Sequence, residues 1–402
     1  LFYPIVGTPF VDHHSTFFII LAFYGLILSI KTNNSNYYFF IPTILCLSFL
    51  SKQTPAAYAI ILISILILII SFFYKQKRVE ILKKFIFGSI IALSFLFLFF
   101  FITKINLDDF IQQYIFFASS IGEERITNYK FNIFNEIFKY KFISYFIFLL
   151  LFTLIKLKLK NSLNIDASFI LVICVIFALL LIFHQMISLN QNFIFFVIPF
   201  LCGIFHCYYK KILKLNYFLI ASLLICIFSI GKYHFRFNEE RKFNELEGID
   251  ISRAVDAKVL DKKLSGLKWI TFHNPNNPQE ELDNLKEAMN LFKNNLSQKM
   301  LITDYQIIAP ILDIYDNSPN QWHHPSVSFP LKNSKYFEVY KDYFIKKIKK
   351  EEIKFIFETR EDTREDNALI ISLILNKNCF AKERVGKLLI KVKLNLDCEE
   401  LK

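Results

Sequence analysis

The chain has 402 residues, of which 54% are hydrophobic and 48 are Phe, and it carries a formal net charge of +12. The hydrophobic residues are concentrated in segment 1–231, which excludes an ordinary soluble globular protein. Much of the positive charge lies in short loops between apolar segments, as in membrane proteins, so we expect no nucleic-acid partner.

Segment 1–231 contains runs with the length and polarity of membrane spans. Ala59 to Phe73 and Phe85 to Ile102 carry no charged residue and lack the polar stripe of a helix on a soluble surface. Hydropathy predicts about eight spans, near 15–31, 37–51, 56–73, 85–103, 141–155, 167–187, 193–209 and 215–231. The first two are short, so they are either tilted or form a re-entrant pair.

The charge of the connecting loops predicts an orientation. Short basic loops mark the cytoplasmic side, and three such loops lie at 75–84, 156–160 and 210–214. The interleaved connections therefore face outward, and they contain the polar motifs of this segment: 1–14, 52–55, 104–140 and 188–192. A polar domain over 232–402 follows on the same side.

The first outward motif is Asp12-His13-His14, which leads directly into the first span. An Asp at this point can cap the helix by accepting bonds from its first backbone N–H groups. A carboxylate beside two imidazoles at a membrane surface can also bind a divalent metal or handle protons. We therefore take Asp12, His13 and His14 as candidate catalytic residues, and Asp12 with His13 as candidate metal ligands.

The second outward motif, Lys52-Gln53-Thr54-Pro55, links the second and third predicted spans. Pro55 suits the first turn of a helix capped by Thr54. Lys52 can extend its ammonium group to the water interface, or it can hold an anionic phosphate with help from Gln53.

Two further outward connections contain polar clusters. Leu107 to Ser119 suits an amphipathic helix in the membrane interface. The cluster that follows is either a solvated helix end or a substrate loop in which Arg125 clamps a phosphate and a carboxylate contacts metal or sugar: Glu123, Glu124 and Arg125. In the last connection, Asn190 and Gln191 either cap the next helix or hydrogen-bond to sugar hydroxyls.

The polar segment 232–402 alternates predicted strands with amphipathic helices, which indicates a small α/β domain. We expect strands over Lys268–Phe272, Lys299–Asp304 and Ile353–Phe357, helices over Pro278–Leu296 and Tyr336–Lys350, and a hairpin over 379–395 that turns near Gly386. No Gly-rich phosphate loop is present. Cys379 and Cys398 can form a disulfide in an oxidising compartment.

Together these features resemble the GT-C glycosyltransferases. The resemblance rests on an Asp-led outward loop entering a helix, the Lys52-Gln53-Thr54-Pro55 loop and an outward α/β tail. The chain looks most like bacterial relatives of the protein mannosyltransferases and of the lipid A aminoarabinose transferase. Asp12 is similar to the second acidic position of that family. The first has no counterpart here, which fits our expectation that the chain, starting at Leu1, lacks N-terminal spans.

The resemblance implies an architecture and an activity. The fold would be a polytopic α-helical membrane domain over 1–231 and an extracytoplasmic α/β domain over 232–402, in a bacterial inner membrane. The enzyme would transfer a sugar from a polyprenyl-phosphate donor to a glycan, lipid or protein acceptor, with Mg²⁺ or Mn²⁺ as the expected cofactor. A transporter or flippase, and a non-catalytic scaffold with an outward partner-binding domain, are the alternatives.

Overall fold

The computed structural model describes residues 11–119, 132–188, 194–210, 216–235, 246–314, 317–320, 323, 329–330, 332–359 and 370–401. The chain divides into two compact units. Unit 1 comprises Leu1–Leu107 and Arg125–Lys242, and unit 2 comprises Asp108–Glu124 and Phe243–Lys402. The chain therefore enters unit 2 twice, once from each half of unit 1.

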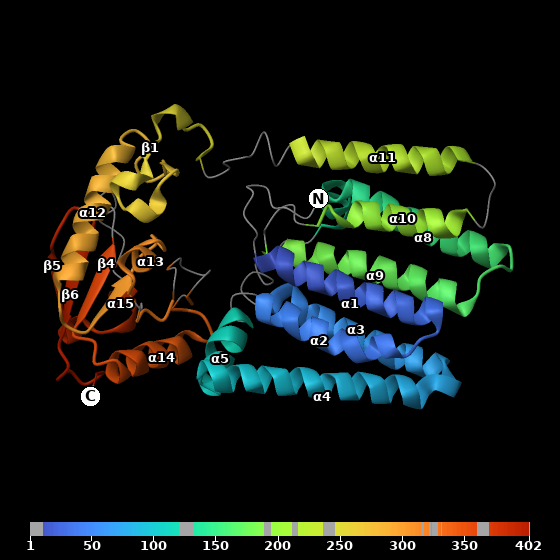
Figure 1. Cartoon of the computed structure of the whole chain (residues 1–402), viewed down its shortest axis with the longest axis horizontal. Helices are drawn as coiled ribbons and strands as arrows, with labels where there is room; N and C mark the ends of the chain where they lie inside the picture. Colours follow the sequence, from blue (N-terminus) through green and yellow to red (C-terminus); the bar gives the residue numbers. More distant parts are fainter. Residues whose placement is uncertain are drawn as a thin grey trace. The chain divides into compact units, whose positions relative to one another are not determined.

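Unit 1 is a bundle of apolar helices that lie side by side (Figure 1). The bundle contains α1 (Val11–Thr32), α2 (Asn36–Ser51), α3 (Gln53–Phe73), α4 (Arg78–Thr103), α8 (Lys141–Leu159), α9 (Ile165–Ser188), α10 (Val197–Tyr209) and α11 (Asn216–His234). The turn η1 (Lys75–Lys77) precedes α4, and the short helix α7 (Ile133–Lys139) precedes α8.

The expected eight spans correspond to these eight helices, but only six described helices are long and apolar enough to cross a membrane. The exceptions are α2 with 16 residues and α10 with 13. At 1.5 Å per residue they reach about 24 Å and about 20 Å, short of a hydrocarbon core of about 30 Å. The first predicted span is longer than expected, since α1 has 22 residues.

Ring contacts fix the direction of the helices in the bundle. Asp12 lies near His184 and Phe23 packs on Phe177, so α1 runs opposite to α9. Tyr58 packs on Phe183 and Phe73 on Phe169, so α3 also runs opposite to α9. Tyr233, near the end of α11, packs on Phe142 in the first turn of α8 and on Phe195 just before α10. The start of α1, the α2–α3 junction, the start of α8 and the ends of α9 and α11 therefore share one end of the bundle, which we call the Asp12 end.

The opposite end carries the basic loops and is called the lysine end. It contains the turn around Lys75 and Lys77, the α8–α9 loop after Lys158, and Lys210 after α10. Helix α4 runs in the same direction as α2, because Cys46 contacts the Ala92 carbonyl and Phe39 lies against Gly88. The chain therefore leaves unit 1 for unit 2 from the Asp12 end both times, after α4 and after α11.

Unit 2 is built on a four-stranded sheet in the order β3-β4-β6-β5. Strands β3 (Lys299–Ile302) and β4 (Phe355–Thr359) are parallel, and β6 (Leu389–Leu394) is antiparallel to both β4 and β5 (Phe380–Arg384). The remaining elements are β1 (Val255–Asp256), β2 (Lys268–Trp269), α12 (Pro278–Asn294), α13 (Ile308–Leu312), α14 (Phe337–Lys350), α15 (Ile370–Ile374) and the turns η5 (Ile251–Arg253), η6 (Ala257–Val259), η7 (Lys262–Leu264) and η8 (Lys377–Cys379).

Strand alternation gives the sheet of unit 2 two cores. Met300 and Ile302 enter one core with Phe344 of α14, whereas Leu301 between them enters the other core with Leu285 of α12. A strand covered on both faces reads as a continuous apolar run, as Met300–Ile302 does within β3. Covering both faces leaves the sheet edges as its exposed backbone, and the edge strand β5 carries charged residues there.

Most predicted elements of unit 2 are confirmed, with one difference. The predicted strand Lys268–Phe272 is only two residues long, and it pairs with β1 outside the main sheet. The reason is local: Thr271 turns its hydroxyl to the carboxylate of Glu281 at 2.8 Å and accepts a bond from the N–H of His273. The predicted interfacial segment 107–119 forms α5 (Leu107–Phe110) and the π-helix η2 (Ile111–Phe117), whose Phe117 stacks on Tyr340 of unit 2.

The C-terminal end of unit 2 is held by a disulfide and an ion pair. Cys379 and Cys398 form a disulfide, one of the two states that the sequence left open for them. Glu400 accepts from the backbone N–H of Asn376 at 2.7 Å and from Lys341 Nζ at 2.9 Å. Partial burial alone would raise the pKa of Glu400, but these two donors hold its pKa below the usual value.

Candidate functional site

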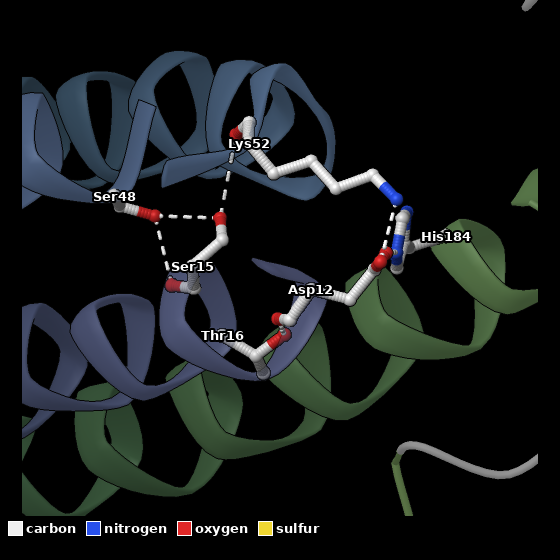
Figure 2. A network of polar contacts seen from close by, with 6 residues as sticks. All are labelled: Asp12, Ser15, Thr16, Ser48, Lys52 and His184. Carbon is white, nitrogen blue, oxygen red and sulfur yellow. Dashed lines mark hydrogen bonds and ion pairs between the residues drawn. The ribbon is translucent and has the colours of Figure 1, made fainter. Parts of the chain in front are cut away.

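Asp12 is the centre of a polar cluster at one end of unit 1 (Figure 2). Helix α1 begins at Val11, so Asp12 lies in its first turn, where the helix dipole favours a negative charge. Asp12, Ser15, Thr16 and Ile19 are spaced along one helical face, and all four are buried. The carboxylate of Asp12 is therefore directed into the bundle and is only 4% exposed.

Lys52 reaches Asp12 because the chain breaks between α2 and α3. Its backbone is extended, with φ −160° and ψ 136°, and Thr54 is extended as well, before Pro55. In a continuous helix the backbone of Lys52 would be helical, and its side chain would leave the chain in another direction. In the structure its Nζ lies 2.5 Å from Asp12 Oδ2, and the Lys52 side chain is 26% exposed.

Two serines fix this junction against α1. Ser48 Oγ donates to the carbonyl of Ser15 at 2.8 Å, and the two hydroxyl oxygens lie 2.9 Å apart. Ser15 Oγ also donates to the carbonyl of Lys52 at 3.4 Å. Both serines are fully buried, so these bonds hold the last turn of α2 beside the first turn of α1.

The third member of the cluster is His184, near the end of α9. Its Nε2 lies 3.6 Å from Asp12 Oδ1, and the side chain is almost completely buried. Sequence reasoning missed this residue and instead selected Asn190 and Gln191 in the connection that follows. The available signal was its position: His184-Gln185 are polar residues at the end of an otherwise apolar span, where ionisable groups are costly and usually functional.

The three side chains form a charge arrangement that is rare inside an apolar bundle. Asp12 Oδ2 faces an ammonium and Asp12 Oδ1 faces an imidazole, and the three side chains come from α1, the α2–α3 junction and α9, which are far apart in sequence. Desolvating such a pair costs several kcal/mol per ion before attraction offsets it, so burial of this kind is weak support for a purely stabilising role. Lys52 keeps further N–H donors and partial exposure, so it can still bind an incoming anion.

Three of the other expected site residues are described by the structure. His13 is partly buried next to Asp12, His14 points to the exposed side of α1, and Gln53 is partly buried after Lys52. The remaining five lie outside the described residues: Glu123, Glu124, Arg125, Asn190 and Gln191.

The described residues do not fit a divalent cation. Within the described ranges, no group of three or more His, Cys, Asp or Glu side chains is placed to hold a metal ion. Asp12, the expected ligand, is already paired with the ammonium of Lys52, which would repel a second cation. We therefore derive no step that passes through Mg²⁺ or Mn²⁺.

At the lysine end, the described carboxylates accept hydrogen bonds from hydroxyl groups rather than from a lysine. Tyr74 donates its hydroxyl to Asp166, and Ser35 donates to Glu80. Lys77 Nζ donates to the carbonyl of Asn33 at 2.7 Å, from an exposed position. Each carboxylate is thus held by a neutral hydroxyl, and the lysine by a neutral carbonyl.

Comparisons with protein-family models, with curated proteins and with solved structures gave no match. The resemblance to the GT-C glycosyltransferases therefore stays a prediction from the sequence.

Proposed function

We propose that this protein is a membrane glycosyltransferase that uses a polyprenyl-phosphate sugar donor, with its site around Asp12, Lys52 and His184. The observation that carries the proposal is the ion pair between the partly exposed Lys52 and the buried Asp12, which also lies beside His184 at one end of an apolar bundle. Burying such a cluster costs desolvation free energy. A reaction in which charge develops at a membrane surface requires charged groups at fixed positions, and this cluster provides them.

The chemistry assigns a role to each member. Transfer breaks the bond between the sugar carbon and the phosphate oxygen, and forms a bond from that carbon to an acceptor oxygen. The leaving phosphate keeps the electron pair, and the remaining N–H donors of Lys52 can stabilise it. The acceptor hydroxyl loses a proton, and Asp12 with His184 are the described groups that can orient this hydroxyl and receive the proton.

Two observations favour one orientation of unit 1 in the membrane. The lysine-rich loops lie at the opposite end of the bundle, which favours a cytoplasmic position for that end. Both connections to unit 2 leave from the Asp12 end, and unit 2 contains the disulfide between Cys379 and Cys398, a bond typical of oxidising compartments. We therefore assign the Asp12 end and unit 2 to the extracytoplasmic face.

The test is sugar release from a panel of synthetic polyprenyl-phosphate sugars by the purified full-length protein, with and without divalent metal. We expect turnover of at least one donor without added metal, and none in Asp12→Asn. Lys77→Gln, which removes a lysine from the opposite end, serves as the control and should keep full turnover. No turnover of any donor by folded wild-type protein would contradict the proposal.

One observation favours a second candidate, an ion-coupled transporter. Buried Asp, Lys and His side chains on membrane-spanning helices are typical of proton and ion pathways. A transporter of this kind would acidify or alkalinise proteoliposomes when substrate is added, whereas a glycosyltransferase would release free polyprenyl phosphate. Measuring both in the same proteoliposomes separates the two functions.

A further inference from the structure

The short helix α7 presents an unusual surface. Its apolar side chains fall at positions 133, 134, 137 and 138, which form one continuous face of a helix, while Asn135, Glu136 and Lys139 form the other. All four apolar side chains are exposed: Ile133 56%, Phe134 70%, Ile137 48% and Phe138 74%. In contrast to an ordinary surface helix, α7 turns its apolar face outward.

Other amphipathic helices of the same chain show what the ordinary arrangement is. Helix α12 buries Leu282, Leu285 and Phe292 in the core of unit 2, and α14 buries Phe344 and Ile348. Two helices with similar patterning thus bury their apolar faces, so the exposed face of α7 needs an apolar environment from outside the described residues.

The neighbours of α7 indicate which environment this is. Only Tyr140 separates α7 from α8, a candidate membrane span that begins at Lys141. Lys139 Nζ lies over the ring of Tyr140 and Lys141 Nζ over the ring of Phe142, at 5.4 and 5.6 Å from the ring centroids. Tyr and Lys directly beside a span are typical of the boundary between acyl chains and headgroups.

From these observations we infer that α7 lies in the plane of the membrane, with Ile133, Phe134, Ile137 and Phe138 in the acyl chains of the extracytoplasmic leaflet. The occupant of this face is lipid, because α7 directly precedes a candidate membrane span that itself exposes large apolar side chains, among them Phe148 and Ile155. Asn132 caps the start of α7 by accepting from the N–H groups of Phe134 and Asn135, and the non-helical backbone of Tyr140, with φ −104° and ψ 30°, separates α7 from the span α8.

The in-plane helix also fixes a depth. The start of α8 lies at the Asp12 end of unit 1, because a short loop joins the end of α8 to the start of α9, and the other end of α9 carries His184 beside Asp12 (Figure 1). A helix lying flat at this end marks the level of the lipid headgroups there. A lipid phosphate would then approach at the end of the bundle that carries Lys52, whatever reaction takes place.

The experiment uses tryptophan as a depth probe in the full-length protein. The chain has two Trp, so Trp269→Phe and Trp322→Phe remove the native signal. Phe138→Trp is then introduced on the apolar face of α7, and Asn135→Trp on its polar face as the matched control. Ile90→Trp on α4, a lipid-exposed position within a span, calibrates the deep level. Each variant is reconstituted in phosphatidylcholine–phosphatidylglycerol vesicles whose lipids carry bromine either near the headgroup or near the chain end.

We expect blue-shifted emission from Phe138→Trp and roughly twofold stronger quenching by the shallow bromines than by the deep ones. Asn135→Trp should emit at longer wavelength with little quenching, and Ile90→Trp should be quenched best by the deep bromines. Three results would overturn the inference. The first is emission of Phe138→Trp at the same wavelength as that of Asn135→Trp. The second is stronger quenching of Phe138→Trp by the deep bromines, which would make α7 part of the span. The third is blue-shifted emission of Phe138→Trp without quenching, which would mean that protein covers this face.

Discussion

The two ends of the helix bundle in unit 1 hold their charged groups by different means. At the lysine end, Tyr74 and Ser35 donate to the carboxylates of Asp166 and Glu80, and Lys77 donates to the backbone carbonyl of Asn33. At the Asp12 end, a carboxylate and an ammonium are drawn together inside the bundle, and an imidazole joins them. Glu80 is exposed and Asp166 is only partly buried, whereas Asp12 is almost completely buried, so the charges at the Asp12 end cost more free energy to desolvate. This difference is the basis for proposing a functional site at the Asp12 end.

The largest effect is expected for Lys52→Gln. This variant leaves the Asp12 carboxylate buried with only the imidazole beside it, so the free energy of unfolding should fall by about 3 kcal/mol. Sugar release should be lost as well. The measurement is thermal unfolding in detergent together with the sugar-release assay, with Lys77→Gln as control. Equal stability of the two lysine variants would show that the two ends do not differ in kind.

His184→Gln should separate activity from stability. Glutamine retains a polar side chain but removes the imidazole, so sugar release should fall about 10²-fold, as for loss of an acid–base group. The free energy of unfolding should change by less than about 1 kcal/mol. His206→Gln is the matched control, since His206 bonds to Ser222 at 2.8 Å between α10 and α11, away from the cluster. Equal activities of the two histidine variants would remove His184 from the site.

Tyr74→Phe probes the lysine end. It removes the hydroxyl that Asp166 accepts and leaves the ring packed against Phe169. We expect a loss of about 1 to 2 kcal/mol in the free energy of unfolding and unchanged sugar release. A large fall in turnover with intact stability would contradict the structural role given to this end.

Glu400 of unit 2 gives a reference outside the membrane and the smallest effect. Its pKa is lowered in the folded protein, so its contribution to stability is present above the unfolded pKa and is lost as pH falls through the folded pKa. Acidification should therefore weaken unit 2 by about 1 kcal/mol through this group. Glu400→Gln should flatten that part of the stability-versus-pH curve, whereas an unchanged curve would rule out the contribution.

The sequence predicted most helices and strands correctly, but it did not predict which side chains from different elements come into contact. Predicted helix Pro278–Leu296 is observed over Pro278–Asn294, and the hairpin near Gly386 and the disulfide are both present, because period, turn residues and cysteines are local signals. The eight apolar helices of unit 1 correspond to the eight predicted spans, but among the described residues only six of these helices are long enough to cross a membrane.

The contacts within the Asp12 cluster could not be predicted from the separate sequence motifs. Asp12 and Lys52 were selected one by one, and neither their ion pair nor the junction serines that support it follows from either motif. Those contacts depend on how α1, α2 and α9 pack, which residues far apart in sequence determine together. His184 was missed for the same reason, since a single histidine in an apolar run gains its meaning only from the carboxylate beside it.

The most direct test of the central claim is the double variant Asp12→Asn with Lys52→Gln. It replaces both charges by neutral side chains of similar size, so no charge is left unpaired. We predict a free energy of unfolding within about 1 kcal/mol of the wild type, because a buried ion pair contributes little net stability. Sugar release should nevertheless be abolished. A double variant that still releases sugar near the wild-type rate would contradict the account.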